Sequence, residues 1–177
     1  MAQVSHKRIL LTNIHHEDQH ELTAYESRGG YQSIRKTMEI EPQKVVDEVK
    51  ASGLRGRGGA GFPTGLKWSF VPRDSGKPVY LLHNADESEP GTFKDRVLIE
   101  KDPHLCIEGM MIAAWALQSG WACIYIRGEY GYPYTCMYAA LQECYEKGYL
   151  GKGIFGSDFD LDICLLYTSD AADDELG

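Results

Sequence analysis

Residues 53–65 combine the residue types that hold a phosphate group. Six glycines lie within these thirteen positions. Glycine lets the backbone adopt positive φ and lets a ligand lie directly against the main chain, where consecutive N–H groups converge on an anion. Lys67 follows closely, and Phe62 and Phe70 stand eight residues apart. The segment therefore predicts a phosphate cradle beside a cation and two aromatic faces.

Residues 56–61 fit the dinucleotide-binding pattern G-x-G-x-x-G. That pattern usually follows a strand, whereas residues 42–51 are typical of a helix, with Val45, Val46 and Val49 on one face. The segment therefore differs from an ordinary Rossmann turn. Two alternatives stay open, a flexible linker and an RNA-binding Arg-Gly-Gly segment at residues 55–59. The single repeat and the acidic chain weigh against the second alternative.

A second polar segment, residues 84–96, follows the apolar residues 79–82. A buried strand that ends in carboxylates and an amide is typical of the place where an open α/β sheet binds ligands. Lys94, Asp95 and Arg96, at the end of this segment, are expected to pair with each other and their neighbours rather than with a cofactor.

Together, these two segments closely resemble the NADH-binding flavoprotein subunit (51 kDa type) of respiratory complex I, the NADH-quinone oxidoreductase. The resemblance covers about residues 9–163. The same family includes the diaphorase subunits of NAD-linked hydrogenases and formate dehydrogenases, which stay an alternative. The serine in the middle of Glu87-Ser88-Glu89 looks more like the respiratory branch. A non-catalytic nucleotide- or RNA-binding module is the alternative from a different class.

The resemblance implies hydride transfer from NADH to FMN, followed by single-electron transfer to iron–sulfur clusters. The flavin supplies that chemistry, so no catalytic side chain and no metal ligand is expected here. The expected cofactors are FMN and NADH, with a 4Fe-4S cluster only in a C-terminal part that the chain lacks. The predicted cofactor-binding residues are Gly56, Arg57, Gly58, Gly59, Ala60, Gly61, Phe62, Lys67, Phe70, Asn84, Asp86, Glu87 and Glu89.

The family's residue roles carry over by resemblance. The flavin side comprises Gly56, Arg57, Lys67, Asn84, Asp86 and Glu87. The NADH side comprises Gly58, Gly59 and Ala60, with Phe62 and Phe70 around the adenine and Glu89 near the adenosine ribose. A carboxylate there repels a 2′-phosphate and so favours NADH over NADPH. Core packing of the two phenylalanines, and solvated positions for Lys67 and the acids, are the alternatives.

The periodicity of the chain predicts alternating helices and strands. Helices are expected at residues 32–38, 42–52, 92–101, 103–119 and 133–147, with a helical turn at 66–70 and Asp102 as a cap. Strands are expected at residues 79–83, 121–127 and 159–163. This alternation predicts an α/β fold, a Rossmann-like and mostly parallel sheet with flanking helices. The domain is expected to be incomplete.

We expect three regions along the chain. Residues 1–40 form an N-terminal extension, residues 41–163 a truncated FMN/NADH-binding domain, and residues 164–177 a non-native tail. The tail resembles the translation of a transposon-type sequencing adapter; a genuine acidic tail is the alternative. In the family, the full-length protein continues with the rest of the flavin site, a ubiquitin-like domain and a cluster-binding helical bundle. We therefore expect the chain alone to be inactive and to bind FMN weakly or not at all.

Composition limits the other function classes. The 177 residues carry a formal charge of −8, which argues against a nucleic-acid surface. The sequence has no run of 18 apolar residues, so no membrane span is predicted. The apolar residues 9–11 are too few for the core of a signal peptide. The five cysteines form no C-x-x-C pair, so we expect reduced thiols in the cytosol. The histidines at residues 15, 16 and 20 could suggest a metal site, but their spacing fixes no ligand set.

By resemblance, the partners are the other peripheral-arm subunits of complex I, especially the 24 kDa-type protein that carries a 2Fe-2S cluster. Neither nucleic acid nor direct membrane insertion is expected. The expected location is the cytoplasm, at the cytoplasmic face of the inner membrane as part of the complex.

Overall fold

The computed structural model describes residues 9–73 and 75–167. Its centre is a parallel sheet of three strands in the order β1-β2-β3. The strands are β1 (Tyr80–Ala85), β2 (Trp121–Ile126) and β3 (Asp162–Tyr167). Tyr80 pairs with Trp121, and Trp121 pairs with Asp162, so the three strands start level with one another. The predicted α/β, Rossmann-like fold with a parallel sheet is confirmed.

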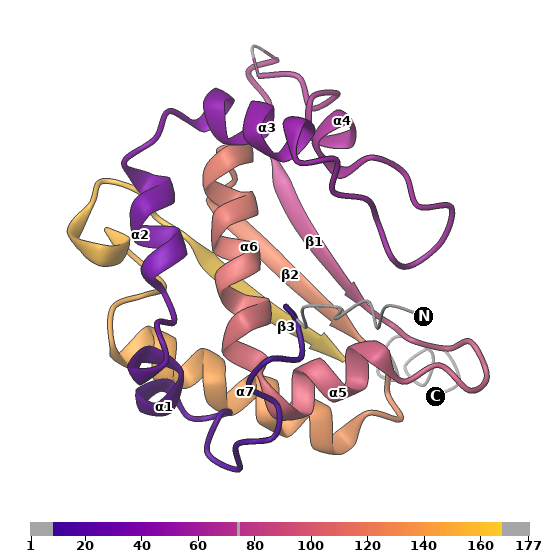
Figure 1. Ribbon diagram of the computed structural model, residues 1–177. Helices are drawn as coiled ribbons and strands as arrows, with labels where there is room; N and C mark the ends of the chain where they lie inside the picture. The colour runs from indigo at the N-terminus through magenta and orange to yellow at the C-terminus, as the bar shows by residue number, and fades with distance from the viewer. Residues whose placement is uncertain (1–8, 74, 168–177) are drawn as a thin grey trace, which may run out of the picture.

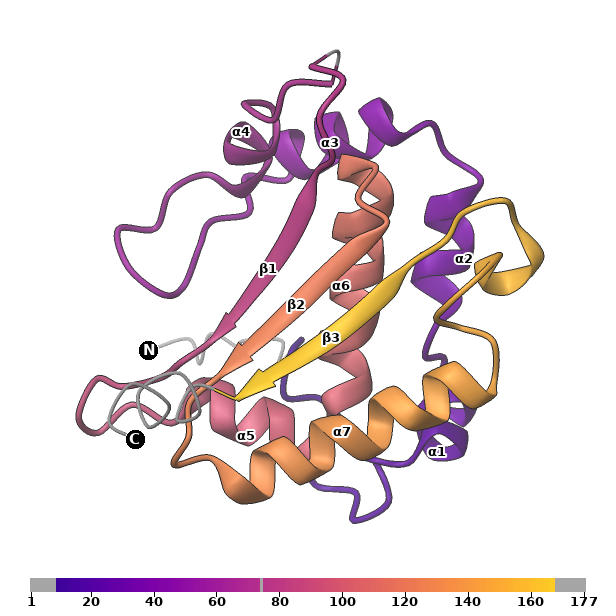
Figure 2. The same ribbon diagram turned by 180° about the vertical axis from the view of Figure 1, so that it is seen from behind.

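The connections between the strands supply the helices that cover the sheet. α5 (Lys94–Lys101) and α6 (Pro103–Leu117) connect β1 to β2, and α7 (Gly131–Glu146) connects β2 to β3. α6 crosses one face of the sheet (Figure 1), and α5 and α7 pack beside it. An apolar stripe of α6, formed by Ile107, Met110, Met111 and Ala114, is buried in the core with Ile124 and Ile126 of β2. From the other side (Figure 2), the strands stand in front of α6, and Leu82, Tyr125 and Leu166 are exposed.

Four helices precede the sheet within the described residues. They are α1 (Leu22–Ser27), α2 (Gln32–Met38), α3 (Pro42–Ala51) and α4 (Thr64–Trp68). α2 and α3 pack against α6, and α4 packs against α3. The predicted helix at 32–38 is confirmed, and so is the start of α3 at Pro42, whose missing N–H costs nothing in a first helical turn. Gly53 follows α3 with a φ of 69°, the conformation that glycine supplies after a helix.

Three local expectations differ from the structure in their bounds or contacts. The strand expected at 159–163 begins only at Asp162, because Leu161 instead forms an antiparallel bridge with Gly151. The helical turn expected at 66–70 is α4, which begins at Thr64, directly after Pro63. Asp102 occupies the N-cap position of α6, but its side chain makes no capping hydrogen bond. α1 had no counterpart in the prediction.

The predicted start of the tail, Cys164, lies within β3. Residues 164–167 are therefore strand residues that pair with β2, while residues 168–177 lie outside the described residues. The origin of the tail stays a prediction. A short 3-10 helix, η1 (Ile154–Gly156), precedes β3. Within the described part of the chain no helix has the length and apolar character needed to span a membrane, and all five cysteines are unpaired.

Candidate ligand-binding cleft

A cleft of about 1070 Å³ lies between the glycine-rich loop and β1. The loop joins α3 to α4 and runs out beside β1 (Figure 1). The opposite wall comes from β1 and from the segment that follows it. The volume suits a nucleotide-sized ligand. The structure brings together every predicted site residue except Phe70: Gly56, Arg57, Gly58, Gly59, Ala60, Gly61, Phe62, Lys67, Asn84, Asp86, Glu87 and Glu89 line this cleft.

Two backbone hydrogen bonds close the base of the glycine-rich loop. The N–H of Gly56 donates to the carbonyl of Phe62 at 3.0 Å, and the N–H of Thr64 donates to the carbonyl of Leu54 at 2.8 Å. Inside the loop, a Cβ atom added at Gly58 or Gly59 would meet no atom within 4 Å. Packing within the chain therefore does not require glycine at Gly58, whereas the φ of 150° at Gly59 by itself favours glycine there. Their bare backbone leaves room for a ligand against the main chain.

Two of the cations that line the cleft come from the loop and from α4. Arg57 belongs to the loop, and Lys67 belongs to α4. α4 lies very close to α3, because a Cβ atom at Gly65 would stand 2.4 Å from the backbone nitrogen of Lys50. Only glycine permits that approach. Gly65 thus determines the position of Lys67. Arg57 and Lys67 are positively charged side chains of the cleft that can pair with a phosphate.

Phe62 and Phe70 form a pair at the side of the cleft. Their ring centroids lie 6.2 Å apart, with the rings tilted by 53°. The two residues are 48% and 65% exposed, so they are not part of the core. Core packing was the alternative interpretation of these residues, and their exposure contradicts it. Exposed aromatic faces are suited to stacking on a planar ligand.

At the carboxyl end of β1, a side-chain hydrogen bond of Asn84 stabilises the turn of the chain. Its side-chain Oδ1 accepts a hydrogen bond of 3.0 Å from the N–H of Asp86, a local bond that asparagine commonly makes in turns. The next residues along this turn, Asp86, Ser88 and Glu89, are exposed or partly exposed and line the cleft. The turn therefore presents carboxylates to the same space as the loop glycines.

Glu87 behaves differently from its neighbours, because its side chain is only 2% exposed. Its carboxylate accepts hydrogen bonds from the backbone N–H groups of Asp95 and Arg96, at 3.0 and 3.2 Å, and from the Tyr130 hydroxyl at 3.1 Å. Burial alone would raise the pKa of Glu87. The hydrogen bonds and the nearby Lys94 ammonium outweigh burial and lower that pKa, so the carboxylate stays ionised.

The segment after Glu87 makes the local ion pairs that the sequence predicted. Lys94 Nζ lies 2.5 Å from Asp95 Oδ2 and 3.5 Å from Glu87 Oε1. Arg96 Nε lies 2.7 Å from Glu100 Oε1, one turn further along α5. The expectation of local pairing for these three residues is confirmed, although Lys94 and Asp95 also line the cleft.

Residues 49–169, which contain both walls of the cleft, match the Nuo51 FMN-binding domain. The chain belongs to this family. Its relatives include an F-type component of the NADH-quinone oxidoreductase of Rhizobium meliloti, which is 54% identical over 153 residues, or 86% of this chain and 36% of the relative. The corresponding protein of Aquifex aeolicus is 53% identical over 144 residues, or 81% of this chain and 34% of the relative. The chain spans about a third of the length of these Nuo51-type relatives.

Solved structures agree with the assignment to the Nuo51 family. A crystal structure of NAD+-reducing NiFe-hydrogenase in the H2-reduced state superposes with a TM-score of 0.68 at 32% sequence identity. The match covers 83% of this chain and 24% of the hydrogenase chain. The air-oxidised state of such a hydrogenase gives a TM-score of 0.67 over 91% of this chain.

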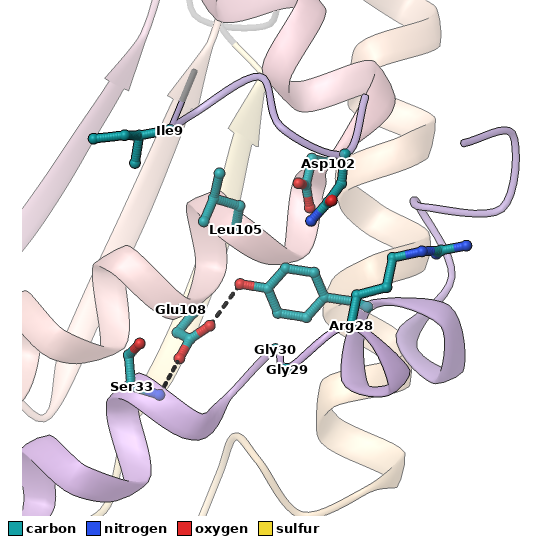
Figure 3. Close-up of a pocket in the computed structure, with 10 residues that line it drawn as sticks. Ile9, Arg28, Gly29, Gly30, Ser33, Asp102, Leu105 and Glu108 are labelled. Carbon is teal, nitrogen blue, oxygen red and sulfur yellow. Dashed lines mark hydrogen bonds between the residues drawn. The ribbon is translucent and has the colours of Figure 1, made fainter. Parts of the chain in front are cut away.

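A second, smaller cavity of about 190 Å³ lies between the α1–α2 connection and α6, and none of the predicted site residues lines it (Figure 3). Its wall includes Glu108, whose carboxylate accepts hydrogen bonds from the Tyr25 hydroxyl at 2.5 Å and the Ser33 N–H at 3.0 Å. Sequence reasoning missed this buried acid. Its signal was an ionisable residue beside Ile107 in the apolar stripe of α6.

Next to Glu108 lies a second polar group that sequence reasoning missed, with Tyr31 and His104 buried and Glu143 partly exposed. The Tyr31 hydroxyl is 2.8 Å from His104 Nδ1, and His104 Nε2 is 3.0 Å from Glu143 Oε2. Burial lowers the pKa of His104, against the opposing effect of Glu143, so the imidazole stays neutral. None of these three residues lines the large cleft. We conclude that this group joins α2, α6 and α7 and supports the fold.

Proposed function

We propose that the large cleft binds FMN with NADH beside it, and that the chain serves in the NADH-oxidising part of a longer protein. One observation carries the proposal. A single cleft combines open loop backbone, the cations of Arg57 and Lys67, and the carboxylates after β1. The description of the family and the names of the relatives support it. FMN, when bound, supplies hydride acceptance from NADH and single-electron transfer to iron–sulfur clusters.

The residues of the chain bind and orient the two ligands in this proposal. The loop N–H groups, Arg57 and Lys67 hold phosphate. Asn84 and Asp86 hydrogen-bond the flavin, with the ionised Glu87 behind them. The residues on the flavin side are Gly56, Arg57, Lys67, Asn84, Asp86 and Glu87. The residues along NADH are Gly58, Gly59 and Ala60, and Gly61 completes the loop.

The adenine end of NADH has its own residues. Phe62 and Phe70 enclose the adenine ring, and such stacking contributes on the order of 1 kcal/mol per pair. Glu89 accepts hydrogen bonds from the hydroxyls of the adenosine ribose. The exposure of all three side chains supports these roles.

A diaphorase role beside a hydrogenase is the second candidate, because an NAD+-reducing hydrogenase shares the fold at 32% identity. The 54% identity to a component of an NADH-quinone oxidoreductase favours the respiratory role. In that role the partners are the other subunits of the complex, with the 24 kDa-type 2Fe-2S protein as neighbour. The location is then the cytoplasmic face of the inner membrane. The RNA-binding alternative has no support from the comparisons.

An NMR titration tests the proposal even when binding is weak. FMN and then NADH are added at millimolar concentration to the isotopically labelled chain. We expect shifts confined to the amides of residues 56–61 and 84–89. Lys67→Ala should weaken the FMN response about tenfold, because a charge-assisted hydrogen bond to phosphate is lost. Lys44→Ala, an exposed lysine on α3, is the matched control.

Two results would overturn the proposal. One is the absence of any amide shift at millimolar FMN and NADH. The other is a set of shifts that lies wholly outside the cleft or that Lys67→Ala leaves unchanged.

A further inference from the structure

Two residues after β2 make hydrogen bonds to Glu87. Arg127 donates a hydrogen bond of 2.7 Å from Nη1 to the backbone carbonyl of Glu87. The Tyr130 hydroxyl donates to the Glu87 carboxylate at 3.1 Å. The carboxyl ends of neighbouring parallel strands lie at the same edge of the sheet, which brings these residues together. Neither Arg127 nor Tyr130 lines the cleft.

Arg127 contacts both Glu129 and Tyr130. The guanidinium of Arg127 makes two hydrogen bonds to the Glu129 carboxylate, at 3.0 and 2.7 Å. The same guanidinium lies 5.4 Å from the centroid of the Tyr130 ring. A two-point hydrogen bond fixes the direction of a guanidinium group. Tyr130 itself is 8% exposed, so its hydroxyl has little freedom to turn elsewhere.

On its other side, Glu87 closes the amino end of α5. Phe93 occupies the N-cap position there and offers no side-chain acceptor. The Glu87 carboxylate serves as the cap instead, because it accepts hydrogen bonds from the N–H groups of Asp95 and Arg96. With Tyr130 and the Lys94 ammonium at 3.5 Å, four donors from the described residues reach this carboxylate. Three hydrogen bonds and one ion pair thus hold this carboxylate, which has about four acceptor positions.

These contacts hold Glu87 in place within the segment that follows β1. Asp86 and Glu89, on either side of it, line the cleft. We infer that Arg127 and Tyr130 are positioning residues of the cleft: they fix Glu87 and, through it, the segment that presents Asp86 and Glu89 to the ligand. This inference rests on the proposed function, since the ligand is taken to be FMN with NADH.

Tyr130→Phe tests the inference, because it keeps the ring and removes only the hydroxyl. Tyr138→Phe, an exposed tyrosine on α7, is the matched control. By titration of amide shifts, Tyr130→Phe should raise the dissociation constants of FMN and NADH about five- to tenfold, in line with loss of a hydrogen bond to a charged group. Tyr138→Phe should leave both constants unchanged.

A second readout follows Glu87 itself. The groups that face its carboxylate are Lys94 on α5 and Tyr130 after β2, with Arg127 on its carbonyl. The Tyr130 hydroxyl helps to lower the pKa of Glu87. In Tyr130→Phe, a carbon-13 titration of the side-chain carboxyl should therefore show protonation of Glu87 at higher pH than in the wild type. Tyr138→Phe removes a hydroxyl that does not act on Glu87, so it should leave this midpoint unchanged.

Arg127→Lys provides an independent variant, should Tyr130→Phe fold poorly. It keeps the positive charge but loses the two-point bond to Glu129. We expect it to weaken the FMN and NADH responses about threefold, with the shifted amides at residues 86–89. Unchanged affinity in both variants, together with an unchanged Glu87 midpoint, would overturn the inference.

The two proposals fail in different ways. If the wild-type chain responds to neither FMN nor NADH, the proposed function fails. The Glu87 midpoint in Tyr130→Phe still reports whether the hydroxyl holds the carboxylate. If the wild type binds but the variants bind equally well, the proposed function stands and the positioning role is refuted.

Discussion

Glu108 on α6 accepts a hydrogen bond of 3.0 Å from the backbone N–H of Ile34 on α2, although 74 positions separate them in the sequence. The same carboxylate accepts the N–H groups of Tyr31 and Ser33. Tyr31 occupies the N-cap position of α2 and makes no side-chain capping bond. A buried acid from another helix thus satisfies the free N–H groups at the start of α2.

Replacing Glu108 with Gln should destabilise the chain. The amide group would point a donor at N–H groups that now meet an acceptor, at a cost of about 2 kcal/mol in the free energy of unfolding. Urea unfolding at neutral pH measures this change. Glu146→Gln, at the last residue of α7, should change the same quantity by less than about 0.5 kcal/mol. Equal effects of the two substitutions would show that the Glu108 bonds do not stabilise α2.

Two glycine-to-alanine substitutions should change the free energy of unfolding in opposite directions. Gly65→Ala would place a methyl group 2.4 Å from the Lys50 nitrogen, so α4 must move away from α3, at a cost of about 2 kcal/mol. At Gly109, within α6, an added Cβ meets nothing within 4 Å. Gly109→Ala should therefore stabilise the chain by about 0.5 to 1 kcal/mol. Urea unfolding tests both, and a stable Gly65→Ala variant would contradict the close approach of α4 to α3.

Stability should fall on mild acidification because of His104. Burial lowers its pKa, so the unfolded chain takes up a proton at a higher pH than the folded chain does. The stability that comes from a neutral His104 is therefore fully present above about pH 6.5 and is lost as the pH falls toward the lower, folded-state pKa. His83, whose pKa burial also lowers, adds an effect of the same sign.

Unfolding by urea at about pH 7.5 and about pH 5.5 measures this loss. The difference between the two free energies should be smaller in His104→Asn than in the wild type. His15→Asn, at an exposed residue before α1, should keep the wild-type difference. An undiminished pH dependence in His104→Asn would refute the assignment.

Glu89 should set the preference for NADH. Glu89→Gln removes a negative charge from the position proposed for the adenosine ribose, so NADPH should gain about tenfold in affinity relative to NADH. Amide-shift titration with each nucleotide measures the ratio, and Glu146→Gln serves as the control. An equal weakening of both nucleotides would mean that Glu89 does not face the 2′ position.

The sequence by itself determined the elements whose signals are local. Pro42 and Gly53 bound α3 because each fixes or frees the backbone at its own position. The residues of the cleft were also predictable, because each wall is a short continuous segment of recognisable chemistry. Among the predicted site residues, only Phe70 lies outside the lining, since its place depends on how α4 ends.

The tertiary structure alone decided how the helix ends are satisfied and where β3 begins. Tyr31 and Phe93 precede α2 and α5 without capping them, so Glu108 and Glu87 supply the acceptors from elsewhere. The hydrophobic periodicity of the sequence does not predict which distant residue will supply such an acceptor. The start of β3 likewise depends on Leu161 pairing with Gly151 rather than with β2. Hydrogen bonds between distant segments form only once the chain has packed, which is why the sequence could not predict them.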